Sequence, residues 1–372
     1  MGRPKVSNKT KTGVRGRRFK LQSFKGSLKG KDIVSVEQFT SKKEIDFLFK
    51  VADEMKQSVE KKVVRDDLRG YCAALLFYQP STRTFTSFLA AAERLGVSYT
   101  IPIPGMNAYS SAVKGESLKD TIRTIEQTTA SDVIILRHPE DSSSQEAAHF
   151  SQAPIISAGS GRVAHPTQAI LDLFTIREEL GKMDGLTVTM IGDLRNGRTI
   201  KSLAKLLVLA GKGIKFNFVS PPVLKMPKEI TIYLKRKKAK VFEGNSEELK
   251  SVLGKTDVLY VTRVQKEWFV KQAMERIKEK LGKEVITVNK EPLLDLAADL
   301  GEASYQEAVT GYVVDLALLR KAKKRMIIMH PLPRVGEIAY EVDDDPRAAY
   351  FKQMRYGLYT RMALLAAVLG KV

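Results

Sequence analysis

Short apolar runs alternate with amphipathic helical patterns along most of the 372 residues, and this alternation constrains the fold more than any other feature. Such a pattern is typical of parallel sheets flanked by helices, because two adjacent parallel strands need a crossover long enough to hold a helix. A chain of this length also exceeds what a single hydrophobic core usually supports. We therefore predict an α/β protein with two doubly wound parallel-sheet domains.

The apolar runs that we interpret as strands cover residues 72–78, 132–136, 154–157, 186–191, 214–219, 257–261 and 326–329. The clearest helical patterns cover residues 42–56, 83–95, 166–180, 199–210 and 348–369. Gly96, Gly181 and Gly211 close three of these patterns, as glycine commonly does at a helix end. The helix at 166–180 separates the two sheets, which predicts one domain from residues 32–175 plus 345–372 and a second from residues 176–344.

The positive charge of the chain is concentrated at its start. Residues 1–31 carry eleven Lys and Arg and no acid, out of a net charge of +20. This segment lacks apolar periodicity, so we interpret it as a disordered, solvated tail. A nuclear-import patch, a nucleic-acid contact and an organellar transit peptide are sharper alternatives, of which nucleic-acid binding is not favoured.

Several classes of protein are excluded by composition. No apolar run reaches the roughly 18 residues of a membrane span, and no signal-peptide pattern is present. The single cysteine, Cys72, lies in an apolar run, which excludes an internal disulfide and fits a reducing compartment. Four histidines without close spacing argue against a zinc site. We expect a cytoplasmic protein, with a nuclear location as the alternative, and neither metal nor cofactor.

The strongest local motif is Ser81-Thr82-Arg83-Thr84, where a strand runs into a helix. Backbone N–H groups at a helix start point at one spot, and the helix dipole adds positive potential there. Arg83 supplies a forked donor suited to phosphate. The alternative is an ordinary Ser/Thr helix cap, but three hydroxyls and an arginine in four positions favour an anion site.

Three further strand ends carry arginine. Residues 192–199 come close to a phosphate-binding P-loop, but Arg198 stands where that motif needs lysine, so we interpret it as a carboxylate clamp. Arg263 and Gln265 follow the strand at 257–261, and Arg137 ends the strand at 132–136. An ordinary strand-to-helix turn is the alternative for residues 192–199.

Two histidines lie beside prolines. His165 precedes Pro166 at the start of a helix, with Gln168 three residues later, a pair suited to polarising and reading a carbonyl group. His330-Pro331-Leu332 is followed by a second proline, and prolines on both sides fix the backbone so that the Leu332 carbonyl can point into a cleft. Each motif alone is weak, since such histidines are usually structural. Together they describe a site that positions and neutralises anions rather than attacking them.

These motifs, with the loop Lys114-Gly115-Glu116, occur in the order found in aspartate carbamoyltransferases, and the resemblance covers about residues 32–370. The sequence at residues 345–351 and 361–365 resembles the transcarbamoylase portion of the fungal and animal multifunctional pyrimidine proteins. Ornithine carbamoyltransferases share the phosphate motif, but they usually carry a cysteine before Leu-Pro, so His330-Pro331-Leu332 favours aspartate. The resemblance implies transfer of a carbamoyl group from carbamoyl phosphate to L-aspartate in pyrimidine biosynthesis, by a homotrimer with active sites shared between subunits.

The resemblance also implies a role for each motif. Residues 81–84 would hold the phosphate, while Thr84, Arg137 and His165 bind the carbamoyl oxygen and Gln168 the carbamoyl amide. The groups that would bind aspartate are Arg198, Arg263, Gln265, Pro331 and the Leu332 carbonyl. The groups that would arrive from a neighbouring subunit are Ser110 or Ser111, together with Lys114.

The chain departs from the family pattern in three respects, the first of which is a pair of residues. Gln79 stands where the family usually has glutamate, and Trp268 where it has arginine, a pair that forms part of a charged bridge between closed domains. The segment from Gln265 to His330 is longer than usual, with an apparent insertion within 272–310, and Lys201 replaces a common histidine. Losing both charges avoids an unpaired buried charge. The alternative function is therefore a paralogue that binds carbamoyl phosphate but has lost or altered activity toward aspartate.

Overall fold

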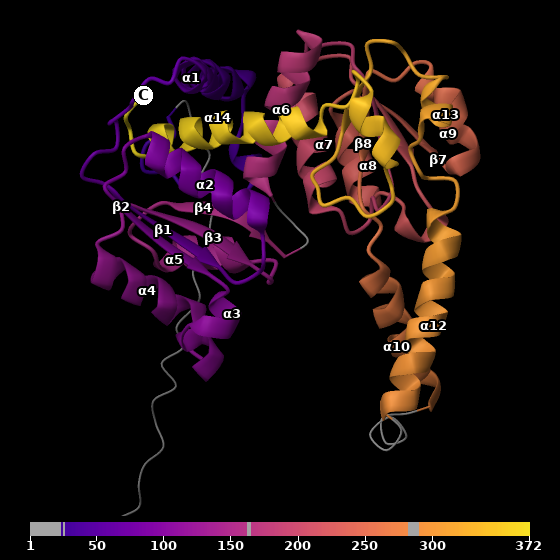
Figure 1. The fold of residues 1–372 in the computed structure, drawn as a ribbon, viewed down its shortest axis with the longest axis horizontal. Helices are drawn as coiled ribbons and strands as arrows, with labels where there is room; N and C mark the ends of the chain where they lie inside the picture. Colours follow the sequence, from indigo (N-terminus) through magenta and orange to yellow (C-terminus); the bar gives the residue numbers. More distant parts are fainter. Residues whose placement is uncertain (1–23, 25–26, 162–164, 282–289) are drawn as a thin grey trace, which may run out of the picture.

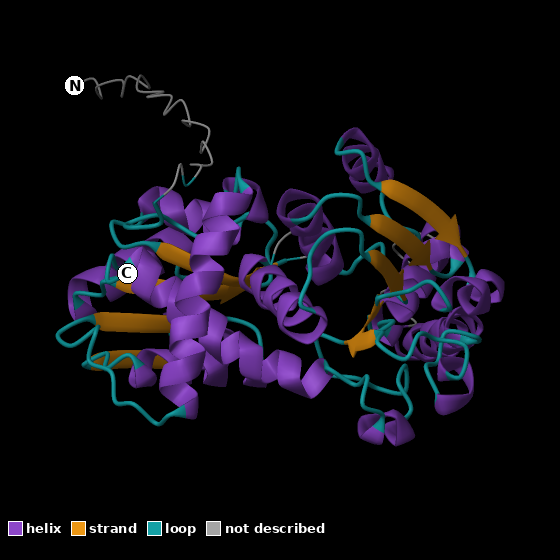
Figure 2. Ribbon diagram, turned by 90° about the horizontal axis from the view of Figure 1, so that it is seen from above, coloured by secondary structure: helices purple, strands orange, loops and turns teal. Residues whose placement is uncertain are grey.

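The computed structural model describes residues 24, 27–161, 165–281 and 290–372. It contains two lobes, each built on one parallel sheet with helices on both faces (Figure 1). The strand order is β2-β1-β3-β4 in the first sheet and β7-β6-β5-β8-β9 in the second. Seen from above, the strands form two separate groups among the helices (Figure 2). The predicted fold class is confirmed.

The first sheet consists of β1 (Cys72–Phe77), β2 (Tyr99–Pro104), β3 (Val133–His138) and β4 (Ile155–Ser160). The helices of this lobe are α1 (Lys42–Glu60), α2 (Thr82–Arg94), α3 (Met106–Tyr109), α4 (Leu118–Thr129), α5 (Ser143–Phe150) and α14 (Tyr350–Val368). Helices α1, α2 and α14 lie on one side of the sheet, and α4 and α5 lie on the other (Figure 1). Every residue of β1 is buried, as expected for a central strand covered on both faces.

The second sheet consists of β5 (Thr187–Ile191), β6 (Lys215–Val219), β7 (Lys240–Gly244), β8 (Val258–Val261) and β9 (Ile327–Met329). Its helices are α7 (Arg198–Ala210), α8 (Lys228–Arg236), α9 (Ser246–Leu253) and α13 (Leu316–Leu319). Alternate residues of β5 face opposite sides, so that Val188 and Met190 pack with α7 and α8 while Ile191 packs with α9 and α13.

Helix α6 (Pro166–Leu180) joins the lobes, and the returning helix α14 packs against α1, α2 and α6. All of α6 from Pro166 to Ile176 is buried. Because α6 packs on both sides, one continuous hydrophobic cluster includes residues of both sheets. The cavity described below therefore lies between lobes that share a core.

Strands β2 and β7 were not predicted from the sequence, and both lie at sheet edges. Each has one hydrogen-bonded neighbour and a partly exposed surface, so its residues do not form an apolar run. Strand β2 contains Pro102 and Pro104, which are tolerated at an edge but not in a central strand. The other two edge strands, β4 and β9, are buried and were predicted, so exposure rather than edge position removes the continuous apolar signal.

The prediction of a disordered tail is wrong for the end of the segment 1–31; residues 1–23 and 25–26 lie outside the described part of the chain. Phe24 and Leu28 are buried in the core of the first lobe. The rings of Phe24 and Phe39 meet edge to face at 4.7 Å between centroids, and the Gly30 N–H donates to the Val368 carbonyl at 2.8 Å. Phe24 and Leu28 thus pack residues 24 and 27–31 against the first lobe, although these two side chains are not part of a periodic apolar pattern.

The segment predicted to contain an insertion forms a helical hairpin of α10 (Lys266–Leu281) and α12 (Lys290–Val309). The hairpin projects from the second lobe (Figure 1). Ala273 and Ile277 of α10 pack against Leu293 and Ala297 of α12. Across the described ranges, every helix falls short of the length and apolarity needed to cross a lipid bilayer.

Phe24→Ala should lower the free energy of unfolding by about 3 kcal/mol, because it removes a fully buried ring and leaves a cavity. Urea unfolding followed by circular dichroism measures this change. Val64→Ala is the control, since Val64 is 93% exposed and its truncation should change stability by less than about 0.5 kcal/mol. Equal unfolding midpoints for the two variants would show that Phe24 does not belong to the core.

Candidate active site

A cavity of about 1430 Å³ lies between the lobes, where the carboxyl ends of strands from both sheets face each other. This is the place at which parallel α/β sheets bind ligands. Twelve of the fifteen predicted site residues line it, and they come from both lobes. They are Ser81, Thr82, Arg83, Thr84, Arg137, His165, Gln168, Arg198, Arg263, Gln265, Pro331 and Leu332.

The start of α2 faces the cavity with its backbone N–H groups. Ser81 is the N-cap residue, with φ −161° and ψ 86°, and its hydroxyl makes no capping hydrogen bond. The Ser81 hydroxyl is therefore available to a ligand, unlike that of an ordinary helix cap. Arg83 sits in the first turn of this helix, and burial lowers the pKa of its guanidinium. Together these groups form an anion site.

Three cationic or imidazole side chains converge on Gly159. A Cβ atom at this glycine would lie 3.0 Å from Nη1 of Arg137, 3.1 Å from Cδ2 of His165 and 3.2 Å from Cζ of Arg198. Gly159 also has φ +115°, a conformation that other residues rarely adopt. Only glycine permits the three side chains to approach one another here.

Burial weakens the charged forms of Arg137 and Arg198, and repulsion from neighbouring arginines adds to this effect at Arg137. The pKa of Arg137 falls to about 9, through burial first and then through Arg198 and Arg83. Burial likewise lowers the pKa of Arg198 to about 10. The buried Nε of Arg137 has no hydrogen-bond partner among the described residues. Both guanidiniums are still protonated at neutral pH, and an anion beside them would relieve these costs.

His165 is the N-cap of α6 and is held as a neutral imidazole. Its Nδ1 accepts the backbone N–H of Gln168 at 3.3 Å, so that the ring proton resides on Nε2. Burial, followed by the neighbouring Arg198 and Arg137, holds the pKa of His165 well below its usual value. A neutral N–H donor of this kind can polarise a carbonyl oxygen without giving up a proton.

In the second lobe, the loop after β5 packs directly on the end of β8. A Cβ atom at Gly192 would lie 2.2 Å from the Thr262 carbonyl oxygen, and Gly192 has φ +103°. Asp193 fixes this loop by accepting the Asn196 N–H at 2.8 Å. Arg198 then reaches the other lobe, where it donates to the Gly161 carbonyl.

Two of the three side chains predicted to clamp aspartate, Arg263 and Gln265, are already engaged by the start of α10. Nη2 of Arg263 lies 2.6 Å from Oε1 of Glu267, and Nε1 of Trp268 donates to Oε1 of Gln265 at 2.9 Å. The Glu267 side chain is 66% exposed, so its pairing with Arg263 is weak. An incoming carboxylate can replace Glu267 at little cost.

His330 holds the loop that carries Leu332. Its Nδ1 accepts the Leu332 N–H at 2.7 Å, and its Nε2 pairs with Oε1 of Glu337 at 2.7 Å. Leu332 has φ +55°, and the Leu332–Pro333 peptide bond is cis. The histidine thus organises the loop, while Pro331 and Leu332 line the cavity.

Three predicted site residues lie outside this cavity. Ser110 is the N-cap of the short helix η2 (Ser111–Lys114), and its hydroxyl accepts the Ala112 N–H at 3.2 Å. Lys114 ends this helix and is exposed. These are the residues that the sequence assigned to a neighbouring subunit.

Two buried charges near the cavity were missed in the sequence. Arg361 lines the cavity from α14, donates to the Ser87 hydroxyl at 2.9 Å and lies over the Phe88 ring. Asp172 is fully buried on α6. Asp172 lies within the apolar run Ile170-Leu171-Asp172-Leu173, and Arg361 directly precedes the apolar residues Met362-Ala363-Leu364. A charged residue in such surroundings is the signal by which each could be found.

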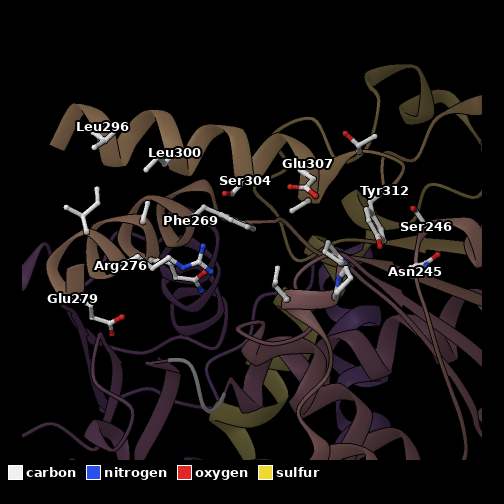
Figure 3. Close-up of a pocket in the computed structure, with 18 of the residues that line it drawn as sticks. Asn245, Ser246, Phe269, Arg276, Glu279, Leu296, Leu300, Ser304, Glu307 and Tyr312 are labelled. Carbon is white, nitrogen blue, oxygen red and sulfur yellow. The ribbon is translucent and has the colours of Figure 1, made fainter. Parts of the chain in front are cut away.

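The body of the helical hairpin does not line the site. Of its described residues, only Glu267 and Trp268 reach the cavity between the lobes. Other residues of the hairpin line a separate hollow of about 1010 Å³, among them Phe269 of α10 and Leu300 of α12, and Tyr312 lines the same hollow (Figure 3). Among the described residues, no group of His, Cys, Asp and Glu gathers as a metal site requires.

Comparison with protein families gives two matches that together span most of the chain. The carbamoyl-phosphate-binding domain of the aspartate/ornithine carbamoyltransferases matches residues 31–178, and the aspartate- or ornithine-binding domain matches residues 184–368.

Individual relatives agree with these matches. Multifunctional protein pyr1-3 of Dictyostelium discoideum is 45% identical over 92% of this chain, which spans only 14% of that relative. The aspartate carbamoyltransferase catalytic subunit of Thermococcus kodakarensis is 41% identical, covering 92% of this chain and 98% of the relative. Aspartate transcarbamoylase of Trypanosoma cruzi, solved with carbamoyl phosphate and aspartate, superposes with a TM-score of 0.77 at 40% identity, covering 92% and 97% of the two chains.

Gly159→Ala should weaken the binding of carbamoyl phosphate by about tenfold or more, because the new Cβ forces apart Arg137, His165 and Arg198. Isothermal titration calorimetry with carbamoyl phosphate measures the affinity. Gly213→Ala is the matched control: it also has a positive φ, of +68°, but its nearest neighbour would lie 3.8 Å away. Equal affinities for carbamoyl phosphate in the two variants would contradict the convergence on Gly159.

Proposed function

The chain belongs to the aspartate/ornithine carbamoyltransferase family, and from that premise we propose that it transfers the carbamoyl group of carbamoyl phosphate to the amine of L-aspartate. The products are N-carbamoyl-L-aspartate and phosphate, in pyrimidine biosynthesis. The observation that carries the proposal is the convergence of the α2 amino terminus with Arg137, His165 and Arg198 in one cavity. It presents donors for two anionic substrates.

The phosphate of carbamoyl phosphate binds at the start of α2. The hydroxyls of residues 81, 82 and 84 and the backbone N–H groups surround it, and Arg83 adds a charged donor. When the C–O bond to the carbamoyl carbon breaks, phosphate leaves with additional negative charge. The helix dipole and the arginine stabilise that charge as it forms.

Negative charge also develops on the carbamoyl oxygen as the aspartate amine attacks. Thr84, Arg137 and the Nε2–H of neutral His165 donate to this oxygen, each stabilising the transition state by about 3 kcal/mol. Gln168 accepts from the carbamoyl NH₂ group. Their low-dielectric surroundings strengthen these interactions, since Thr84, His165 and Gln168 are all buried.

The second lobe binds aspartate. Arg198, Arg263 and Gln265 take its two carboxylates, and Arg263 exchanges Glu267 for the substrate. The Leu332 carbonyl accepts from the amine and orients its lone pair toward the carbamoyl carbon. Cationic clamps of this kind suit a dicarboxylate and not the cationic side chain of ornithine.

We further propose a cytoplasmic homotrimer in which Ser110 or Ser111 and Lys114 complete the site of a neighbouring subunit. Their position on an exposed segment outside the cavity supports this arrangement. A buried cysteine thiol suits a reducing compartment, and the basic amino-terminal segment keeps a nuclear location as the alternative. A paralogue inactive toward aspartate is not favoured, because the groups proposed to bind aspartate are gathered in the cavity.

The purified protein should form N-carbamoyl-L-aspartate, detected by mass spectrometry, and should form no citrulline when ornithine replaces aspartate. His165→Ala should lower kcat by about a hundredfold or more, because it removes a donor to the developing oxyanion. Its effect on phosphate affinity should be small. Absence of carbamoyl-aspartate at saturating substrates would remove the proposed function.

Gln79 and Trp268 line the cavity from opposite lobes. The effects on kcat/KM of placing opposite charges at these two positions should therefore depend on each other. Gln79→Glu and Trp268→Arg should each lower kcat/KM, whereas the double variant should recover and lower the KM for aspartate, because the two new charges meet on closure. A double-mutant cycle of steady-state rates should give a coupling energy of about 1 kcal/mol. Strictly additive effects would show that the two side chains do not meet.

The shared site can be tested by mixing. Lys114→Met and Arg198→Met should each be nearly inactive as pure assemblies. A trimer that contains both kinds of subunit holds some sites with both native residues, so mixed samples should regain activity after subunit exchange. Activity that stays at the sum of the two pure variants would place Lys114 and Arg198 in the same subunit's site, or Lys114 in none.

A further inference from the structure

One buried carboxylate connects the two loops that read the substrates. Asp172 is 0% exposed and lies one helical turn after Gln168 on α6. Its Oδ1 accepts Nε2–H of Gln168 at 2.8 Å and Nε2–H of Gln353 at 2.6 Å. Its Oδ2 accepts the hydroxyl of Tyr260 at 2.7 Å. The donors come from α6, α14 and β8, and thus from both lobes.

Both amides turn their NH₂ groups toward Oδ1 of Asp172, which accepts a hydrogen bond from each. The oxygen of each amide then points elsewhere. Gln168 lines the cavity, and its Oε1 is left to accept from a ligand. Oε1 of Gln353 accepts the His330 N–H at 3.1 Å, which anchors the loop that carries Leu332.

A carboxylate in this position is costly. Burial raises the pKa of Asp172 to about 7, although Tyr260, the two amides and the buried guanidinium of Arg361 oppose that rise. An apolar side chain of similar size usually gives a core equal or greater stability than a buried charge. Stability alone therefore does not explain a carboxylate here.

We propose that Asp172 is a positioning residue that fixes the amide orientation of Gln168 and Gln353, and through them sets both substrate-reading groups. The Gln168 oxygen is held ready for the carbamoyl NH₂, and the Leu332 carbonyl is held ready for the aspartate amine. This inference rests on the proposed function. It adds a single acceptor, outside the substrate contacts, on which both lobes depend.

Asp172→Leu removes the acceptor and should weaken carbamoyl phosphate binding by about tenfold. Acetyl phosphate is the discriminating probe, because it keeps the carbonyl and phosphate but has a methyl group in place of NH₂. Its affinity should change by less than about twofold. Asp172→Asn retains an acceptor oxygen and should restore most of the affinity for carbamoyl phosphate. Calorimetric titration of the native protein and both variants with each acyl phosphate measures these affinities.

A merely structural role predicts that the binding of both acyl phosphates weakens equally in Asp172→Leu, and that outcome would overturn the proposal, as would an unchanged affinity for carbamoyl phosphate. Gln353→Leu tests the other branch and decides the matter if Asp172→Leu fails to fold. It should raise the KM for aspartate by about tenfold while leaving the preference between the two acyl phosphates unchanged. An unchanged KM would overturn this branch.

Gln306→Leu is the matched control for Gln353→Leu, because the exposed side-chain amide of Gln306 donates to Glu302 on the same helix, α12, and its loss should leave both constants unaltered. The native protein separates the two levels of inference. If it neither binds carbamoyl phosphate nor forms carbamoyl-aspartate, the proposed function fails. If it does both while the variants show no discrimination between the acyl phosphates, only the role of Asp172 fails.

Discussion

The burial of cations in the cavity between the lobes is the constraint on which the rest of this structure depends. Burial lowers the pKa of Arg83, Arg137 and Arg198, and Arg198 and Arg83 lower that of Arg137 further. The large shared core offsets this cost, and α6 and α14 provide that core by packing across both lobes. An anionic ligand stabilises the charged guanidiniums. The same burial that weakens these charges therefore favours the binding of anions in the cavity.

The parallel sheets explain why individually weak motifs combine into a specific site. The chain places Ser81, Arg137 and Arg198 far apart in sequence, but each follows a strand whose carboxyl end meets the same cavity. Sequence reasoning could predict this convergence, because it needs only strand positions and the topology of parallel sheets. The same reasoning explains why Ser110 and Lys114 fall elsewhere, since the segment that carries them follows the edge strand β2.

What the sequence did not disclose depends on contacts between distant residues. Asp172 meets Gln353 and Tyr260, which lie 181 and 88 residues away along the chain, and no local pattern identifies such partners. The edge strands β2 and β7 lack an apolar run because one side of each is exposed. Phe24 shows no periodic neighbours, and its burial depends on Phe39. Local patterns thus locate buried strands and helix starts, whereas exposed edge strands and contacts between distant residues require the folded chain.

The root of the hairpin explains how an uncharged residue is accommodated at position 268. Phe269 is buried in a cluster with Leu224, Val264 and Ala308, which fixes the root of α10 against the second lobe. With the root fixed there, Trp268 is held beside the cavity, where its indole N–H donates to Gln265. Gln79 lines the same cavity from the first lobe and is also uncharged, so these two side chains form no ion pair between the lobes. The hydrogen bond of Trp268 to Gln265 is a neutral contact within one lobe.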